Sequence, residues 1–172
     1  MKFKNINHFV SVFAFFIIVS FFLGNYVGLD RHWTSVYDQE FTLSYNALLF
    51  NNGLKMQYID HPGYFTILFL SLFLKALSIL DFLSVDKLSL ISKENFDQSF
   101  QEIISYARIY SIFLVSIFSF FNYVLIYIFS KNKLFSFFLT LIIFTSPGTI
   151  FHITELRTEL MAMLLVLVSL IF

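Results

Sequence analysis

Two carboxylates, Asp38 and Glu40, open a polar stretch whose residue types could carry chemistry. A carboxylate can take a proton from a reacting hydroxyl, and an Asp can also cap the start of a helix by accepting backbone N–H groups. In a continuous helix the two side chains would point about 200° apart. They therefore converge only if Asp38 is at the cap, and both interpretations, catalysis and simple capping, are open.

A second polar element, Asp60-His61-Pro62-Gly63, predicts a rigid turn. Pro62 fixes its own φ and disfavours helix at His61, and Gly63 permits close approach of the backbone. Asp60 and His61 could carry chemistry or simply form a turn at the water boundary. The four histidines have no metal-site spacing and the chain has no Cys, so we expect no metal or other cofactor; nothing indicates a divalent cation.

A third polar group, Glu155, Arg157 and Glu159, lies near the end of the sequence. Glu155 and Glu159 are four residues apart, so we expect them to share one helical face. That face could line a polar cleft, or it could be a hydrated helix end with its own ion pairs.

The elements that must position these residues are those of a membrane protein. The chain has 172 residues, 58% hydrophobic and 13% charged, whereas soluble domains have about 45–50% apolar and about 25% charged residues. The charges of eleven basic and eleven acidic side chains cancel. The sequence therefore has no excess of positive charge of the kind that binds nucleic acid. We predict an all-α, polytopic transmembrane helix bundle with four or five apolar segments. These are Phe9–Leu29, Tyr64–Leu80, Ile109–Phe129, Leu134–Phe151 and Leu160–Phe172.

The region between the first two segments, residues 30–63, is predicted to be an outer loop. Lys2 and Lys4 precede the first segment, and the positive-inside bias places them in the cytoplasm. Within the loop, apolar residues at helical spacing over 37–50 predict an amphipathic helix that lies at the membrane interface, with Asn52-Gly53 as its stop.

The topology after the loop has two alternatives, because Tyr64–Leu80 is short and carries Lys75. If this segment crosses the membrane, Lys131 and Lys133 lie outside; if it does not, they lie inside and the late acidic group lies outside. The positive-inside rule favours the second alternative.

The order of these motifs resembles the integral-membrane GT-C glycosyltransferases, in particular the lipid A aminoarabinose transferase and protein O-mannosyltransferase-like group. In that family an acidic pair, a helix ending in Gly and a Pro-containing turn occupy the first outer loop. An Arg at a helix head, a basic turn, a Ser-Pro and an Arg-x-acid element follow. The matching pieces here are Asp38-Gln39-Glu40, Asn46–Gly53, Asp60-His61-Pro62-Gly63, Ala107-Arg108-Ile109, Ser130–Lys133, Ser146-Pro147 and Arg157-Thr158-Glu159.

The resemblance implies a glycosyltransferase that moves a sugar from a polyprenyl-phosphate donor to an acceptor on the non-cytoplasmic side. By motif match Asp38 is the catalytic base, and Glu40 positions the acceptor or adjusts the charge of Asp38. The substrate-binding residues implied by the match are His61, Arg108, Arg157 and Glu159.

We expect a multi-pass protein of the bacterial inner membrane, with the bilayer and a lipid-linked sugar as partners and no nucleic acid. The last apolar segment, Leu160–Phe172, is about 20 Å long as a helix. We therefore expect residues 1–172 to be the N-terminal part of one glycosyltransferase-like domain, inactive in isolation. The alternative is a non-catalytic membrane protein, such as a transporter piece or a scaffold subunit.

Overall fold

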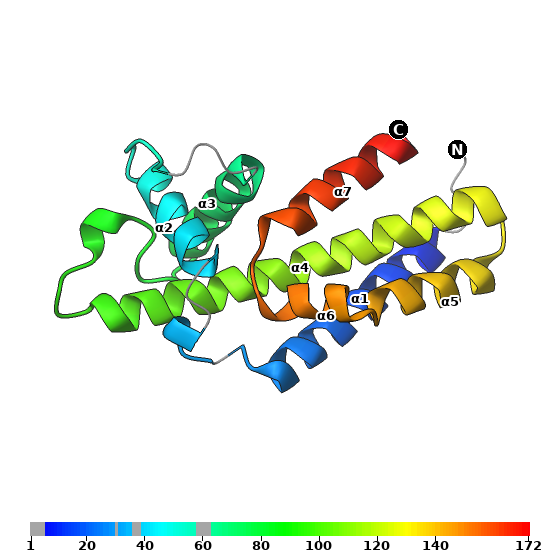
Figure 1. Cartoon of the computed structure of the whole chain (residues 1–172), viewed down its shortest axis with the longest axis horizontal. Helices are drawn as coiled ribbons and strands as arrows, with labels where there is room; N and C mark the ends of the chain where they lie inside the picture. The colour runs from blue at the N-terminus through cyan, green and yellow to red at the C-terminus, as the bar shows by residue number, and fades with distance from the viewer. Residues whose placement is uncertain (1–5, 30, 36–38, 58–62) are drawn as a thin grey trace.

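The computed structural model describes residues 6–29, 31–35, 39–57 and 63–172. Within these ranges all regular structure is helical, which confirms the predicted all-α class (Figure 1). Two short 3-10 turns, Trp33–Ser35 and Leu88–Leu90, accompany the α-helices. The α-helices are α1 (Ile6–Val27), α2 (Gln39–Asn51), α3 (Tyr64–Ile79), α4 (Phe96–Ser130), α5 (Lys133–Phe144), α6 (Pro147–Thr154) and α7 (Thr158–Ile171).

The axis of the molecule is α4, a continuous helix of 35 residues (Figure 1). At about 1.5 Å per residue it is about 52 Å long, which exceeds a hydrocarbon core of about 30 Å. The apolar segment Ile109–Phe129 predicted from the sequence forms its later part. The earlier part, Phe96–Ala107, lies beside α2 and α3. One helix thus connects two different regions of the fold.

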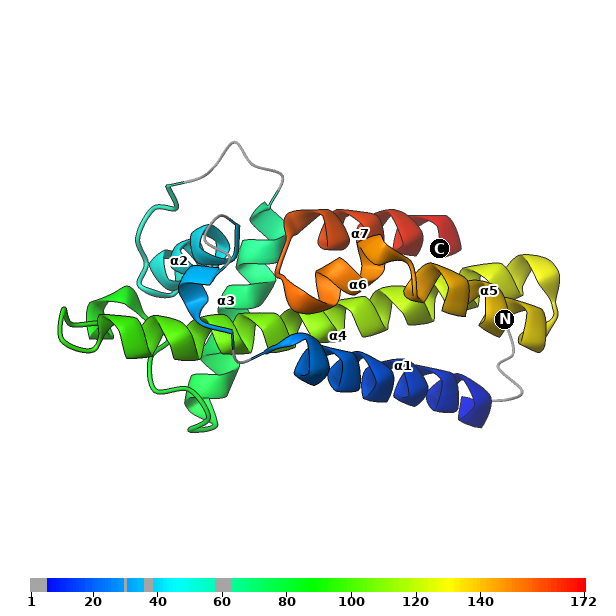
Figure 2. The ribbon, with the colours of Figure 1, turned by 60° about the horizontal axis from the view of Figure 1, so that its bottom comes forward.

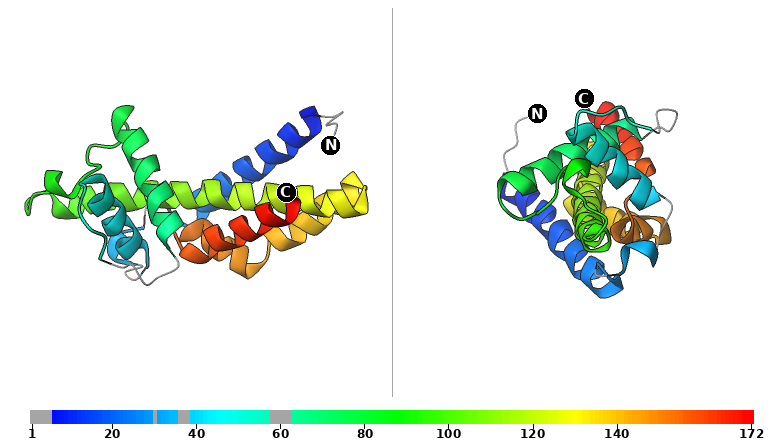
Figure 3. Two further views of the ribbon diagram at one scale, coloured as in Figure 1. Left: turned by 90° about the horizontal axis from the view of Figure 1, so that it is seen from above. Right: turned by 90° about the vertical axis from the view of Figure 1, so that its left-hand side faces the viewer.

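The first region is a bundle in which α1, α5, α6 and α7 surround the later part of α4 (Figure 2). The start of α1 lies near the end of α4, where His8 Nε2 and Tyr123 Oη are 2.6 Å apart. The two helices pack closely at Gly24, where a Cβ would lie 2.5 Å from Ile112 Cδ1, so a larger residue would force that side chain to move. Viewed from above, α1 diverges from α4 toward its own N-terminal end (Figure 3).

In the part of the chain that the structure describes, two helices, α1 and α4, are long and apolar enough to cross a membrane. The pair α5 and α6 passes the same test together but is bent by 65° at its break, which gives three candidate spans in all. The break lies just before Pro147, the first residue of α6, which has no N–H group to continue the hydrogen bonds of the preceding helix. The other apolar helices, α3 with 16 residues and α7 with 14, are shorter. The structure therefore supports two or three spans of the four or five predicted.

The second region, which we call the head, consists of residues 31–35, α2, α3, residues 81–95 and the first part of α4 (Figure 2). The helix predicted over 37–50 is α2, and its apolar residues Leu43, Ala47 and Leu48 are buried. They pack within the head, against α3 and α4. The location of this helix at the membrane interface stays a prediction.

The stop predicted for α2 at Asn52-Gly53 is confirmed. Gly53 has a φ of +70°, a left-handed conformation that favours glycine. The N–H groups of Leu54 and Gly53 donate to the carbonyls of Leu49 and Phe50, both at 3.0 Å. These are the two hydrogen bonds of a Schellman motif, which satisfies carbonyls that the end of a helix leaves without partners.

Single cysteine variants give a test of which segments share a side of the membrane, because the chain has no Cys of its own. Two exposed residues are at the head end: Glu94 belongs to the head, and Lys55 follows α2 directly after its stop at Gly53. Lys133 lies beyond the opposite end of α4. We expect Lys55→Cys and Glu94→Cys to react with a membrane-impermeant maleimide from one side and Lys133→Cys only after permeabilisation. Labelling of Lys55→Cys and Lys133→Cys from one side, with Glu94→Cys protected, would contradict this arrangement.

Candidate functional site

A buried ion pair, Arg108 with Glu40, joins the head to the bundle. Arg108 lies on α4 and Glu40 in the first turn of α2, and their side chains are 0% and 1% exposed. Arg108 Nη2 is 3.0 Å from Glu40 Oε2, and Nε lies 3.3 Å and 3.2 Å from the two carboxylate oxygens. Two nitrogens of the guanidinium thus donate hydrogen bonds to the carboxylate. Arg–carboxylate pairs are strongest when two nitrogens donate in this way.

The other donors and acceptors of this pair bind backbone groups from two further segments. Arg108 Nη1 donates to the carbonyl of Leu29, at 3.1 Å, and to that of Arg31. Glu40 Oε1 accepts the N–H of Leu156, at 3.1 Å. The chain after α1, the start of α2, the middle of α4 and the chain after α6 therefore meet at one ion pair.

The pair is stabilising only as a complete unit. Burial raises the pKa of the Glu40 carboxyl above its ordinary value, and the hydrogen bonds and charge of Arg108 oppose that rise. Two charges taken out of water cost several kcal/mol each, which excellent geometry and further hydrogen bonds offset. Both conditions are met here, so the carboxylate depends on Arg108 for its negative charge.

Next to this pair the bundle has a break in its helical structure, at residues 155–157 between α6 and α7. Glu155 and Arg157 have extended backbone, with φ near −140°. Ser111 on α4 donates to the carbonyls of His152 and Glu155, at 2.6 Å and 3.1 Å. Arg31 Nη2 donates to the carbonyl of Thr154, at 2.7 Å. Side chains from outside the helix thus satisfy the carbonyls that the end of α6 leaves free.

The charged residues of this break form a small cluster at the head end of the bundle. Arg157 Nη2 lies 3.3 Å from Glu155 Oε2, and its guanidinium lies 4.5 Å from the centre of the Phe151 ring. Glu159 is in the first turn of α7, where a negative charge is favourable to the helix dipole. The inference that Glu155 and Glu159 share one helical face is wrong, because the helix is broken between them.

The structure brings some of the residues singled out in the sequence together and leaves others apart. Glu40 and Arg108 are bound to each other. Arg157 lies near them, because the N–H of the preceding residue, Leu156, donates to Glu40. Asp38 and His61, the predicted base and one predicted substrate contact, lie outside the described residues. Among the described residues, no three His, Cys, Asp or Glu side chains form a group that could hold a metal ion.

His152 is a polar residue of this region that the sequence analysis considered only as a metal ligand. Its side chain is buried at the end of α6, and its Nδ1 has no hydrogen-bond partner among the described residues. The charges of Glu159, Arg157 and Glu155 all act on its ring. No local sequence signal marks His152 as a buried polar residue, because the residues that surround it come together only through the break after α6.

Comparisons of the chain with protein-family models, curated proteins and solved structures give no match, so no family is assigned to it. Its class rests on the fold: an all-helical protein with two or three helices long and apolar enough to cross a membrane. Beyond that class, the particular activity is a matter of proposal.

Removal of one member of the ion pair tests its role in stability. We expect Arg108→Met to lower the free energy of unfolding in detergent by about 3–5 kcal/mol, because it leaves a buried carboxylate unpaired. The double variant Arg108→Met with Glu40→Met should lose less than the sum of the single variants. The single Trp33, buried against Phe41 in the head, provides the fluorescence signal.

The control for this cycle is Glu94→Gln, because Glu94 is exposed in a loop of the head. It should change the stability by no more than about 0.5 kcal/mol. Effects of Arg108→Met and Glu40→Met that simply add in the double variant would show that the two side chains act independently.

Proposed function

We propose that the chain is part of a membrane glycosyltransferase of the GT-C type in the bacterial inner membrane. It would transfer a sugar from a polyprenyl-phosphate donor to an acceptor on the non-cytoplasmic side. The proposal rests on the ordered motifs of the sequence, from Asp38-Gln39-Glu40 to Arg157-Thr158-Glu159, and on their relation in the fold.

The observation that carries the proposal is the hydrogen bond from Leu156 N–H to Glu40. These residues are 116 positions apart. Glu40 is part of the motif Asp38-Gln39-Glu40, and Leu156 directly precedes the motif Arg157-Thr158-Glu159. A transferase needs a base and a group that binds phosphate close together, and a contact between these two parts of the chain supports such a site.

In the proposed reaction a hydroxyl of the acceptor attacks the anomeric carbon of the donor sugar. The new glycosidic C–O bond forms as the bond from that carbon to the phosphate oxygen breaks. Asp38 takes the hydroxyl proton, and the leaving polyprenyl phosphate takes the electron pair. Arg157 and His61 would stabilise the charge that develops on the phosphate.

Glu40 and Arg108 would act on the site indirectly. Their side chains are buried and engaged with each other, so in this proposal they hold the loop that follows α1 and the start of α2 against the break after α6. Glu159 and Glu155 then set the charge around Arg157.

A second candidate function, transport without catalysis, is favoured by one observation. The bundle contains a helix pair bent by 65° and a further break at residues 155–157. Interrupted helices with free helix ends are typical of the binding sites of secondary transporters. The two candidates differ in the fate of the lipid donor, because only a transferase releases polyprenyl phosphate.

The test uses the protein encoded by the complete gene, reconstituted in liposomes with a panel of polyprenyl-phosphate sugars and a cell-envelope extract as the source of acceptors. Release of polyprenyl phosphate is measured, since it is common to all such donors. We expect release by the natural protein and a decrease of about 10²–10⁴-fold in Asp38→Asn, the range for loss of general-base catalysis.

Glu94→Gln is the matched control, because it also neutralises a carboxylate of the head, at an exposed position away from the ion pair. It should leave the rate of release unchanged. Failure to release polyprenyl phosphate from any donor of the panel, or full activity of Asp38→Asn, would overturn the proposal.

A further inference from the structure

Helix α3 has a face of large apolar side chains that is exposed at the surface of the molecule. These side chains recur at intervals of three, four and seven positions, which places them on one side of the helix. They are 45% to 73% exposed, and we call them the α3 stripe: Phe65, Phe69, Leu72 and Ile79. A contiguous apolar surface of this kind marks contact with a partner molecule or with a membrane.

The place where α3 packs on α4 is the start of the apolar part of α4. Phe73 of α3 lies against Tyr110 and Phe113 of α4, with ring centres 5.5 Å and 6.4 Å apart. Arg108 is the last charged residue before the uncharged stretch Ile109–Phe129. At 1.5 Å per residue, the two ring contacts lie about 2–6 Å inside that stretch. Helix α3 is therefore attached at the level where α4 passes from the head into its candidate membrane span.

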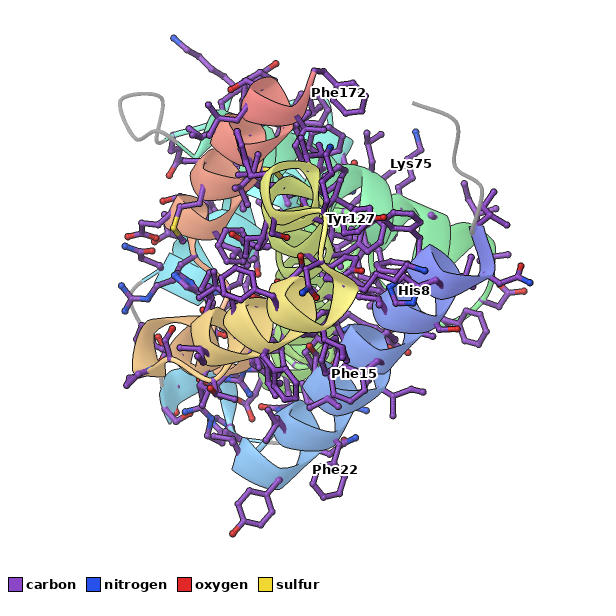
Figure 4. All side chains as sticks on the ribbon, turned by 90° about the vertical axis from the view of Figure 1, so that its right-hand side faces the viewer. His8, Phe15, Phe22, Lys75, Tyr127 and Phe172 are labelled. Carbon is purple, nitrogen blue, oxygen red and sulfur yellow. The ribbon has the colours of Figure 1, made fainter. Side chains whose placement is uncertain are left out.

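The direction of α3 is across α4, as Figures 2 and 3 both show. Figure 4 looks along the bundle from the end opposite the head, and in this view α3 extends sideways from α4 while Lys75 points away from the bundle. A helix that crosses a membrane-spanning helix steeply runs along the membrane surface. The 16 residues of α3 also make a helix only about 24 Å long, shorter than a hydrocarbon core of about 30 Å.

The two edges of the α3 stripe differ in chemistry. On a helix with about 100° per residue, Tyr64 and Lys75 lie along one edge, and both are exposed. Phe73 lies along the other edge, which touches the apolar stretch of α4. Lys75 is the one charged residue of α3, and a long Lys side chain keeps its charge in water while its stem covers apolar surface. Tyr is common at the same depth, where the lipid headgroups lie.

We propose that α3 is an in-plane membrane helix, and that the partner of its stripe is the acyl layer of the leaflet on the head side. Tyr64 and Lys75 lie at the level of the headgroups of that leaflet. An interfacial helix buries its apolar face about 5–10 Å into the boundary between headgroups and acyl chains, which agrees with attachment near the start of the apolar stretch of α4.

The position of the stripe favours lipid over a protein as its partner. The stripe belongs to a helix that directly contacts α4 at Tyr110 and Phe113. The apolar surface of the candidate span therefore continues onto α3, and whatever surrounds the one also reaches the other. A bilayer that surrounds the span meets the stripe without any further component.

The experiment measures the depth of single nitroxide labels on the full chain in phosphatidylcholine liposomes. Labels are attached to Phe65→Cys, Phe69→Cys, Leu72→Cys and Ile79→Cys, one at a time. Collision with oxygen, which concentrates in hydrocarbon, is compared with collision with a water-soluble nickel chelate. Positions 65 and 79 are about 21 Å apart along the helix. We expect all four labels to lie in hydrocarbon, at depths that differ by less than half of that distance.

Two reference variants calibrate the depth. Glu94→Cys, at an exposed position of the head, should be in water. Ile142→Cys, at an exposed apolar position on α5, should be deeper in hydrocarbon than any label on the α3 stripe, because α5 belongs to the bundle. The substituted side chains are all exposed, so little packing is lost, and circular dichroism of each variant checks that the helical content is unchanged.

Three results would overturn the proposal. A depth that changes steadily from position 65 to position 79 would show that α3 crosses the membrane. Stripe labels as accessible to the nickel chelate as the label at position 94 would show that α3 lies in water. Labels shielded from both oxygen and the chelate would show that protein covers the stripe. None of these measurements depends on sugar transfer, so the proposed transferase activity can fail without affecting this result.

Discussion

The buried pair of Arg108 and Glu40 is the interaction on which the rest of this structure depends. In a small, strongly apolar chain most contacts between helices are non-directional, and many relative positions of the helices would bury similar areas. The ion pair removes this freedom, because its hydrogen bonds have fixed directions and reach four separate segments of the chain. Apolar packing holds the helices together, and the pair selects one arrangement among those that packing allows.

This constraint also explains why the breaks in the helices are tolerated. The carbonyls at the end of α6, which have no partner within the helix, accept hydrogen bonds from Ser111 and Arg31. The N–H of Leu156 donates to Glu40. In a hydrocarbon environment an unsatisfied backbone group costs several kcal/mol, so irregular backbone persists only where protein groups replace water. The polar residues of this region are thus required by the architecture, whatever further chemistry they support.

Much of the fold could be predicted from the sequence, because composition and apolar run length act locally. The helical class, the apolar segments and the stop at Gly53 all follow from nearest-neighbour patterns. The site could be predicted only in part. Glu40 and Arg108 were recognised as separate motifs, but nothing in the sequence shows that they bind each other across 68 positions.

The dependence on long-range contacts also accounts for the incorrect inference about Glu155 and Glu159 and for the omission of His152. A spacing of four implies a shared face only on an unbroken helix, and the extended residues Glu155 and Arg157 lie between α6 and α7. The surroundings of His152 are likewise created by that break. The number of spans differs for a related reason: α3 and α7 are apolar enough to pass as membrane segments by composition, but their helices are short.

The separation of the partners of Glu40 along the chain has a consequence for biosynthesis. Its contact with Arg108 cannot form until 68 further residues have been made, and that with Leu156 needs 116. At about 5–20 residues per second, translation takes roughly 6–23 seconds to supply the last partner. Until these partners have been made, the Glu40 carboxylate has to remain hydrated, because its burial depends on them. The final position of α2 on the bundle therefore waits for Arg108 and then for the segment after α6 to emerge from the ribosome.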